Sequence, residues 1–202
     1  MGFPALMGYK YMDIGMATVC HFFYPVAVTI MMFLFFHEKL TGKRIVSVAM
    51  TCAALLMLFF SSGTASLFGI CLALGSGIVW GMYLIALDRA SYRTLPDGVS
   101  VVYVLGIMGV LFLLVSVLSW KYVVPGRIQV LELLLGAAGI AAGEYLTVRS
   151  IHLIGPTIAA FICLFEPVTC LITDFLVYHT VPSVIQLIAY SLMIGAIIIT
   201  SS

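Results

Sequence analysis

The chain has 202 residues, of which 63% are hydrophobic and only 8% are Asp, Glu, Lys or Arg, and its formal net charge is +1. So few charged side chains cannot keep the surface of a soluble domain of this size hydrated, which excludes a water-soluble globular fold. The sequence has no basic cluster, so we expect neither a nucleic-acid partner nor a helix lying on a membrane surface. The composition predicts a protein that lies within a lipid bilayer.

Membrane-spanning helices are predicted from apolar segments that end at Gly, Pro or charged residues. The hydrocarbon core of a bilayer is about 30 Å thick and needs roughly 20 apolar residues per helix. The segments that meet this requirement are Gly15–Phe36, Arg44–Ser61, Ser66–Leu87, Val99–Tyr122, Val130–Ile151, Pro156–Tyr178 and Val184–Thr200. The predicted fold class is an all-α polytopic transmembrane helical bundle with about seven spans.

The orientation of these spans follows from the Lys and Arg residues in alternate loops, because cytoplasmic loops carry the excess. One set of loops contains Lys39, Lys43, Arg44, Arg89, Arg93 and Arg149, and the other contains Lys10, Lys121 and Arg127. We therefore expect the loops at residues 37–44 and 88–98, together with the C-terminus, to lie inside. Arg149 is expected to reach the cytoplasmic interface.

An internal repeat relates the two ends of the chain. When the sequence is laid on itself so that His37 falls on His179, Phe23–Val26 falls on Phe165–Val168. We call this shift the repeat offset. Five helices separate the two copies, so successive copies cross the membrane in opposite directions. The sequence therefore predicts an inverted repeat, which is the usual plan of secondary carriers.

The segments that carry this repeat resemble the EamA-type repeats of the drug/metabolite transporter superfamily. Residues 24–41 resemble the end of the first repeat, residues 66–91 the first helix of the second, and Phe165–Val168 with the last helix the end of the second. The resemblance implies inverted five-helix repeats in a ten-helix carrier. We thus expect residues 1–63 to be the C-terminal part of a first, incomplete repeat and residues 64–202 a complete second repeat, in an N-terminally truncated chain.

The sequence departs from the family pattern at the end of each repeat. The family usually has a small residue before an acidic one, whereas His37 precedes Glu38 here, and Thr180 replaces the acid in the second repeat.

Ionisable side chains deep in a bilayer cost several kcal/mol unless they face a partner or a water-filled cavity, so they are candidates for function. The candidates that lie deep within the predicted spans are His21, Glu144, Glu166 and Asp174. We expect His21, Glu144 and Glu166 to bind substrate, with Tyr145 beside Glu144. Asp174 either extends the site or lies near the outer interface.

Glu166 belongs to a polar stripe that also contains Cys163, Cys170 and Thr173 at three- and four-residue spacing. Such spacing places side chains on one face of a helix, here a face towards the cavity. The alternative is that Glu166 only caps backbone donors near Pro167. Pro25 and Pro167, one in each repeat, are candidate hinge or pathway residues, and a purely structural kink is the alternative for both.

The span at residues 66–87 carries Trp80 and Tyr83, which we expect to bind substrate through indole and phenol donors. The alternative is an aromatic belt at the membrane interface. The Gly77-x-x-x-Gly81 and Gly139-x-x-x-Gly143 patterns predict close helix packing, because small residues allow helices to approach in lipid.

No signal for catalysis, a metal or a cofactor is found. The five cysteines lie in apolar segments and are interpreted as inert hydrophobic residues. His37-Glu38 begins like the H-E-x-x-H zinc motif, but Thr41 takes the place of the second histidine. We therefore expect a protein that is not an enzyme and that has neither a catalytic residue, a metal site nor a cofactor.

The leading hypothesis is a secondary transporter, either a permease or an exporter, of small metabolites such as amino acids or drugs. It would work by alternating access around a midplane cavity. Its expected location is the cell (inner) membrane, its partners are a small-molecule substrate and the lipid bilayer, and a homodimer is left open. The alternative is a non-transporting membrane module or an inactive fragment that packs against another membrane protein.

Overall fold

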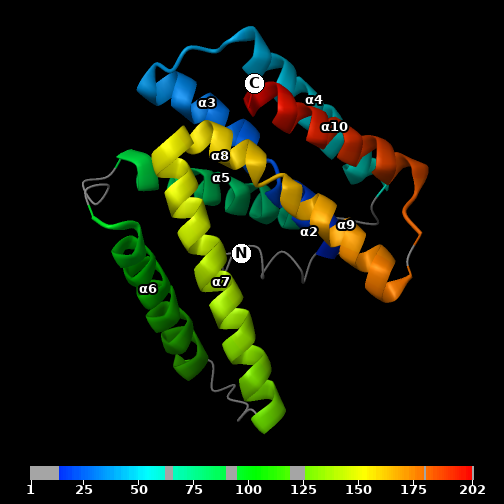
Figure 1. Ribbon diagram of the computed structural model, residues 1–202. Helices are drawn as coiled ribbons and strands as arrows, with labels where there is room; N and C mark the ends of the chain where they lie inside the picture. The colour runs from blue at the N-terminus through cyan, green and yellow to red at the C-terminus, as the bar shows by residue number, and fades with distance from the viewer. Residues whose placement is uncertain (1–13, 62–65, 90–94, 119–125, 180, 202) are drawn as a thin grey trace. The chain divides into compact units, whose positions relative to one another are not determined.

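The computed structural model describes residues 14–61, 66–89, 95–118, 126–179 and 181–201. Within these ranges all regular structure is helical (Figure 1). The helices are α2 (Ile14–His21), α3 (Tyr24–Phe36), α4 (Gly42–Ser61), α5 (Leu67–Arg89), α6 (Asp97–Leu118), α7 (Arg127–Ile154), α8 (Pro156–Ile162), α9 (Phe165–Tyr178) and α10 (Val184–Ser201). The predicted all-α fold class is confirmed.

Seven helical segments of the described part are long and apolar enough to cross a membrane. They are Met16–Phe36, Gly42–Ser61, Leu67–Arg89, Asp97–Leu118, Ile128–Ile154, Pro156–Val177 and Val184–Ser201. Each corresponds to one predicted span, and the first and sixth consist of two helices joined at a break. The end predicted at Tyr122 lies outside the described residues. The chain is a multi-pass membrane protein.

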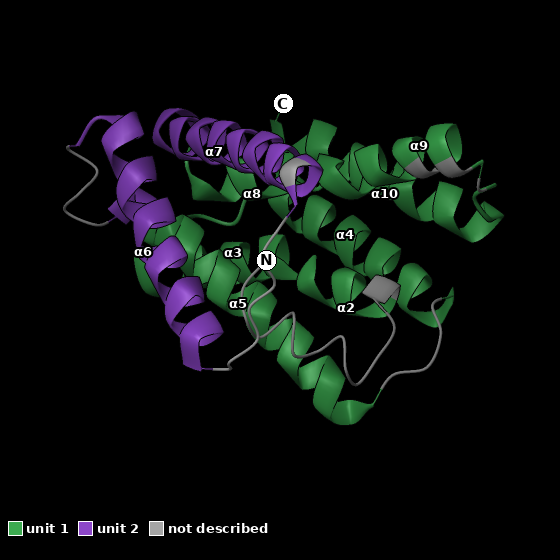
Figure 2. Ribbon diagram, turned by 90° about the horizontal axis from the view of Figure 1, so that it is seen from below, with its two compact units in different colours: residues 1–86, 155–202 green, residues 87–154 purple. Residues whose placement is uncertain are grey.

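The chain forms two compact units (Figure 2). The first unit contains residues 1–86 and 155–202, and the second contains residues 87–154. In the second unit α6 packs against α7. The division at residues 63 and 64 predicted from the repeat concerns the sequence copies, and it stays a prediction.

Helices α4 and α10 lie side by side in the first unit and run in opposite directions (Figure 1). The Oγ of Ser47, near the start of α4, donates a hydrogen bond of 3.0 Å to the carbonyl of Ala196, near the end of α10. The buried side chains of the pair are Ser47, Thr51, Ala54, Leu55 and Leu58 on α4 and Ala189, Met193 and Ala196 on α10. Most of them are small, which lets the two backbones approach in lipid.

The sequence repeat is also present in the backbone. Helix α3 ends at Phe36 and α9 at Tyr178, and α4 begins at Gly42 and α10 at Val184, so both boundaries recur at the repeat offset. The buried positions Ser47, Thr51 and Ala54 recur as Ala189, Met193 and Ala196 at the same offset. Since α4 and α10 are antiparallel, these helices have the inverted relation that the sequence predicts.

Both long spans that contain the repeated proline are broken at nearly equivalent points. Turns at residues 22–23 separate α2 from α3, and turns at residues 163–164 separate α8 from α9. Pro25 and Pro167 follow these turns at the start of the next helix. Proline has no backbone N–H to donate to the carbonyl four residues earlier, and its ring clashes with that carbonyl, so a continuous helix is disfavoured there.

Candidate functional site

The first helix break positions a buried histidine against α5. His21 is the last residue of α2 and only 7% exposed, and its Nδ1 lies 2.9 Å from the Oγ of Ser76 on α5. The Ser76 hydroxyl donates its hydrogen to the carbonyl of Ala73 at 2.7 Å. Since a hydroxyl has only one hydrogen, Ser76 accepts from His21, and this geometry assigns a proton to Nδ1.

Aromatic rings gather around His21. The centroid of its ring lies 5.7 Å from that of Tyr24 and 6.5 Å from that of Trp80. The rings of Trp80 and Tyr83 on α5 are 5.1 Å apart. The structure therefore brings together three of the predicted binding residues, His21, Trp80 and Tyr83, and adds Tyr24, which sequence reasoning missed. Its position beside Pro25, equivalent in the repeat to that of Glu166 beside Pro167, was the available signal.

The close approach of α5 to this break depends on two glycines. A Cβ atom added at Gly77 would lie 2.6 Å from the carbonyl oxygen of His21. A Cβ atom at Gly81 would lie 3.1 Å from side-chain atoms of Val28 and Met31 on α3. The packing predicted for the Gly77-x-x-x-Gly81 face is confirmed. The carbonyl that α5 approaches is the one to which Pro25 cannot donate.

The second break carries the polar stripe predicted on α9. Cys163 is half-buried, and Glu166 in the first turn of α9 is exposed, as are Cys170 and Thr173. The Tyr24 side chain lies within hydrogen-bonding reach of the Cys163 side chain and close enough to Glu166 to interact electrostatically. The two breaks, one from each repeat, thus meet within the first unit. The side chain of Asp174 lies outside the described residues.

The structural role left open for Glu166 also has support. A negative charge in the first turn of a helix is stabilised by the helix dipole. The backbone N–H of Glu166 donates to the carbonyl of Cys163 at 3.0 Å. However, an exposed carboxylate within a membrane span needs water or a cationic partner, so the dipole does not by itself account for its position.

Glu144 and Tyr145 lie on α7 in the second unit, where Glu144 is half-buried and Tyr145 is 43% exposed. Apart from the neighbouring residues and backbone of α7 itself, no described atom lies within 4 Å of a Cβ added at Gly139 or Gly143. The close packing predicted for the Gly139-x-x-x-Gly143 face is therefore not confirmed. The pattern permits an approach, but a partner helix must lie opposite that face for packing to occur.

A polar cluster that sequence reasoning missed joins three parts of the second unit. Asp97, at the start of α6, pairs with Arg149 at 3.0 Å and with Nδ1 of His152 at 2.8 Å, both on α7. Nε2 of His152 lies 3.3 Å from the carbonyl oxygen of Leu87. Arg149, which was expected to reach the interface, has this carboxylate as a partner. The contacts join positions far apart in the sequence, so spacing along one helix did not indicate them.

An apolar groove of about 340 Å³ lies between α2, α4 and α5 in the first unit. Its lining residues are Val19, Cys20, Phe23, Cys52, Leu55, Leu56, Phe59, Ile70 and Leu74. A lining of this kind is unsuited to a polar solute, because it offers hardly any hydrogen-bonding groups. In this respect the groove differs from the cluster around His21.

Comparisons with known proteins give matches of two kinds, to solved structures and to a family model. A crystal structure described only as that of a protein superposes with a TM-score of 0.79 at 18% sequence identity, covering 98% of this chain and 70% of that chain. At this identity the likeness shows the fold alone. The comparison with curated proteins gives no match.

The sequence model of the EamA-like transporter family matches residues 67–202. This range begins at the first residue of α5 and includes every helix from α5 to α10, which is more than half of the chain. The chain therefore belongs to the EamA-like transporter family, whose members are membrane transporters of the drug/metabolite type and not enzymes.

Proposed function

We propose that this protein is a secondary transporter of small metabolites, such as amino acids or drugs, and that it binds them at the two helix breaks. The observation that carries the proposal is the meeting of both breaks, through Tyr24 and the side chains of Cys163 and Glu166. Substrate sites of secondary transporters are typically built from discontinuous helices at the interface between inverted repeats.

The groups at the breaks favour a solute with a flat apolar part and an amino group. Trp80 and Tyr83, which are half-buried, offer apolar ring faces together with indole and phenol donors, and the buried rings of His21 and Tyr24 pack beside them. The carboxylate of Glu166 offers the negative charge. Glu144 and Tyr145 on α7 stay predicted substrate-binding residues, a role that rests on their sequence alone.

The proposed mechanism is alternating access, in which the inverted halves rock around the midplane site. Pro25 and Pro167 serve as the hinge residues, since each adjoins a break. Protonation of Glu166 couples transport to a proton gradient. The location in the cell membrane and a homodimeric state belong to the same proposal.

Transport assays in proteoliposomes test this proposal. The purified chain would be assayed for counterflow of a panel of labelled amino acids and organic cations, with and without a pH gradient. We expect Glu166→Gln to reduce flux by about tenfold, which corresponds to about 1.4 kcal/mol, and to abolish the response to the gradient. Glu132→Gln on α7 is the matched control, because it removes an exposed carboxylate from the second unit.

Equal flux and equal pH response for Glu166→Gln and the unmodified protein would remove Glu166 from the mechanism. The absence of flux for every solute, with protein that is folded and monodisperse, would instead favour the alternative, a membrane module that packs against another protein.

A further inference from the structure

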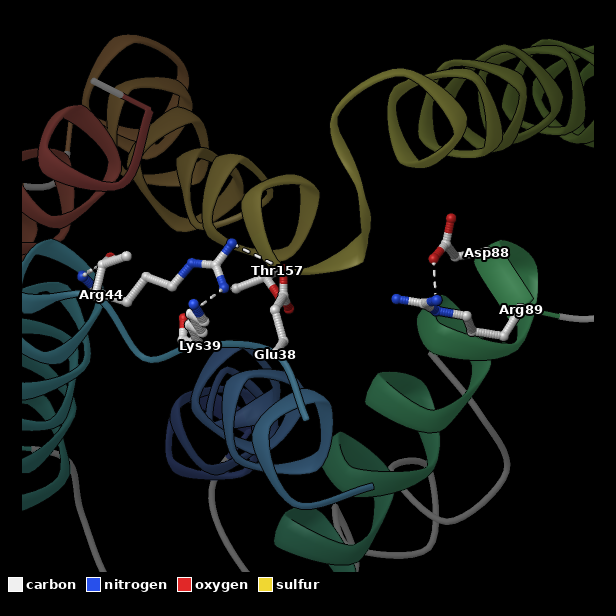
Figure 3. A network of polar contacts seen from close by, with 7 residues as sticks. Glu38, Lys39, Arg44, Asp88, Arg89 and Thr157 are labelled. Carbon is white, nitrogen blue, oxygen red and sulfur yellow. Dashed lines mark hydrogen bonds and ion pairs between the residues drawn. The ribbon is translucent and has the colours of Figure 1, made fainter. Parts of the chain in front are cut away.

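Three side chains of the first unit form a clasp between the two repeats (Figure 3). Glu38 lies in the loop between α3 and α4, Arg44 in the first turn of α4, and Thr157 at the second residue of α8. Arg44 Nη2 lies 2.9 Å from Oε1 of Glu38, and the Thr157 hydroxyl donates to Oε2 at 3.1 Å. We call Glu38, Arg44 and Thr157 the clasp.

The clasp uses both oxygens of one carboxylate for different purposes. The ion pair with Arg44 stays within the first repeat, while the bond from Thr157 reaches the second repeat over 119 residues of sequence. Thr157 is only 2% exposed, so its hydroxyl would be costly to bury without this acceptor. The bond between Thr157 and Glu38 therefore joins the α3–α4 loop to the start of α8.

The backbone holds Glu38 in place before the clasp forms. His37 ends α3 in the left-handed conformation, and the N–H of Glu38 donates to the carbonyl of Met32 at 3.1 Å. On the far side of the loop, Arg44 Nη1 donates to the carbonyl of Lys39 at 3.4 Å. Both ends of this short loop are thus anchored, and the carboxylate has little freedom to lose when it binds Thr157.

The positions that the repeat relates to the clasp carry residue types that cannot form the same three contacts. The repeat offset places Thr180 at the position of Glu38, Gln186 at that of Arg44 and Gly15 at that of Thr157. The second set of positions thus lacks the carboxylate, the guanidinium and the hydroxyl that form the clasp. Gln186 has a local role instead, because its Oε1 accepts from the backbone N–H of Ser183 at 2.8 Å at the start of α10.

We propose that the clasp is a one-sided gate, which closes the transporter at the end that carries the α3–α4 loop. This inference rests on the proposed transport function. In alternating access the two facing states exchange the roles of the inverted repeats, so they would be equally stable if both ends carried the same contacts. Because the residues related to the clasp by the repeat cannot form its contacts, the state closed at the end that carries the clasp is favoured. The Lys and Arg residues of the loop predict that this end faces the cytoplasm.

Cysteine labelling from each side of the membrane tests the gate. Cys163, at the second helix break, is kept as the reporter, and Cys20, Cys52, Cys71 and Cys170 are replaced by serine. A membrane-impermeant maleimide is then added from either side of vesicles of known orientation. We expect the unmodified clasp to allow labelling mainly from the side opposite the α3–α4 loop.

Thr157→Val removes only the hydroxyl of the clasp at nearly constant volume. We expect it to raise labelling from the loop side by about tenfold, and Thr157→Ser to restore the original pattern because it keeps the hydroxyl. Glu38→Gln retains an acceptor but loses the ion pair with Arg44, so a smaller shift in the same direction is expected. Should Thr157→Val fail to fold, Glu38→Gln decides the question.

Asp97→Asn is the matched control, because its ion pair with Arg149 at 3.0 Å has a similar length but lies within the second unit. It should leave the sidedness of labelling unchanged. Identical sidedness for folded Thr157→Val and the unmodified clasp would overturn the gate. The labelling assay needs no substrate, so it tests the gate separately from transport. A shift in labelling without flux would support the gate and contradict the transport proposal. Flux without a shift in labelling would support transport and contradict the gate.

Discussion

His37 and His179 occupy equivalent positions of the two repeats and adopt the same left-handed backbone conformation, with φ angles of 55° and 53°. They are the non-glycine residues with positive φ in the described part of the chain, and each directly follows the end of a helix. For a residue with a Cβ atom this conformation costs roughly 1–2 kcal/mol. The recurrence of the same strained cap shows that the repeat extends to the backbone.

We expect His37→Gly and His179→Gly each to raise the free energy of unfolding by about 0.5–1 kcal/mol, because glycine adopts positive φ without steric cost. Thermal unfolding in detergent would show a rise in Tm of about 2 °C for each. Gly155→Ala is the reverse control, since Gly155 has a φ of 82° and should lose stability. A lower Tm for both histidine variants would contradict the strain argument.

The two glycine patterns provide a matched pair of substitutions. Gly77→Ala places a Cβ 2.6 Å from the carbonyl oxygen of His21, so α5 must shift and we expect a loss of about 1–3 kcal/mol. Gly139→Ala meets no described atom of another helix within 4 Å and should gain up to about 1 kcal/mol from helix propensity. Thermal unfolding of both variants measures the difference. Stability changes of the same sign would show that the packing of α5 against the break is not tight.

The interface between α4 and α10 should resist larger side chains. Ala54 and Ala196 occupy equivalent positions of the repeat, and both are 0% exposed. We expect Ala54→Leu and Ala196→Leu to cost about 1–3 kcal/mol each by forcing the helices apart. Ala53 is exposed on the neighbouring position of α4, so Ala53→Leu should cost little. The free energies of unfolding of the three variants, measured in one detergent, would test this. Equal losses of stability for Ala53→Leu and Ala54→Leu would contradict the tight packing of α4 against α10.

The stability of the polar cluster in the second unit should depend more on Asp97 than on Arg149. Asp97 has an exposed side-chain fraction of 12% and two partners, whereas that of Arg149 is 56%. Asp97→Asn keeps one acceptor oxygen but leaves one donor facing an amide NH2 and removes the negative charge, so it should destabilise α6 and α7 by about 1–3 kcal/mol. Arg149→Gln should cost less than about 1 kcal/mol, because the pair is exposed on that side. Hydrogen exchange of the α6 and α7 amides measures both, and the opposite order would refute this account.

The membrane location, the seven spans and the inverted repeat could be predicted from the amino-acid sequence, since they depend on runs of apolar residues and on identities at a constant offset. The sequence also indicated Trp80 and Tyr83 as one helical face. The sequence did not distinguish the two glycine patterns, although Gly77 packs against His21 and a Cβ at Gly139 meets no described atom of another helix within 4 Å. Both patterns have the same spacing, and spacing does not tell whether another helix lies opposite.

The pairing of distant polar groups became known from the packing of the helices in three dimensions. That packing places Thr157 against Glu38 over 119 residues and His152 against Asp97 over 55. It also places Tyr24 beside the second break. Helix periodicity assigns side chains to a face, but it does not state which helix lies opposite. That choice depends on how the small and bulky faces of several helices fit together in the bilayer, and the clasp and the candidate site both follow from it.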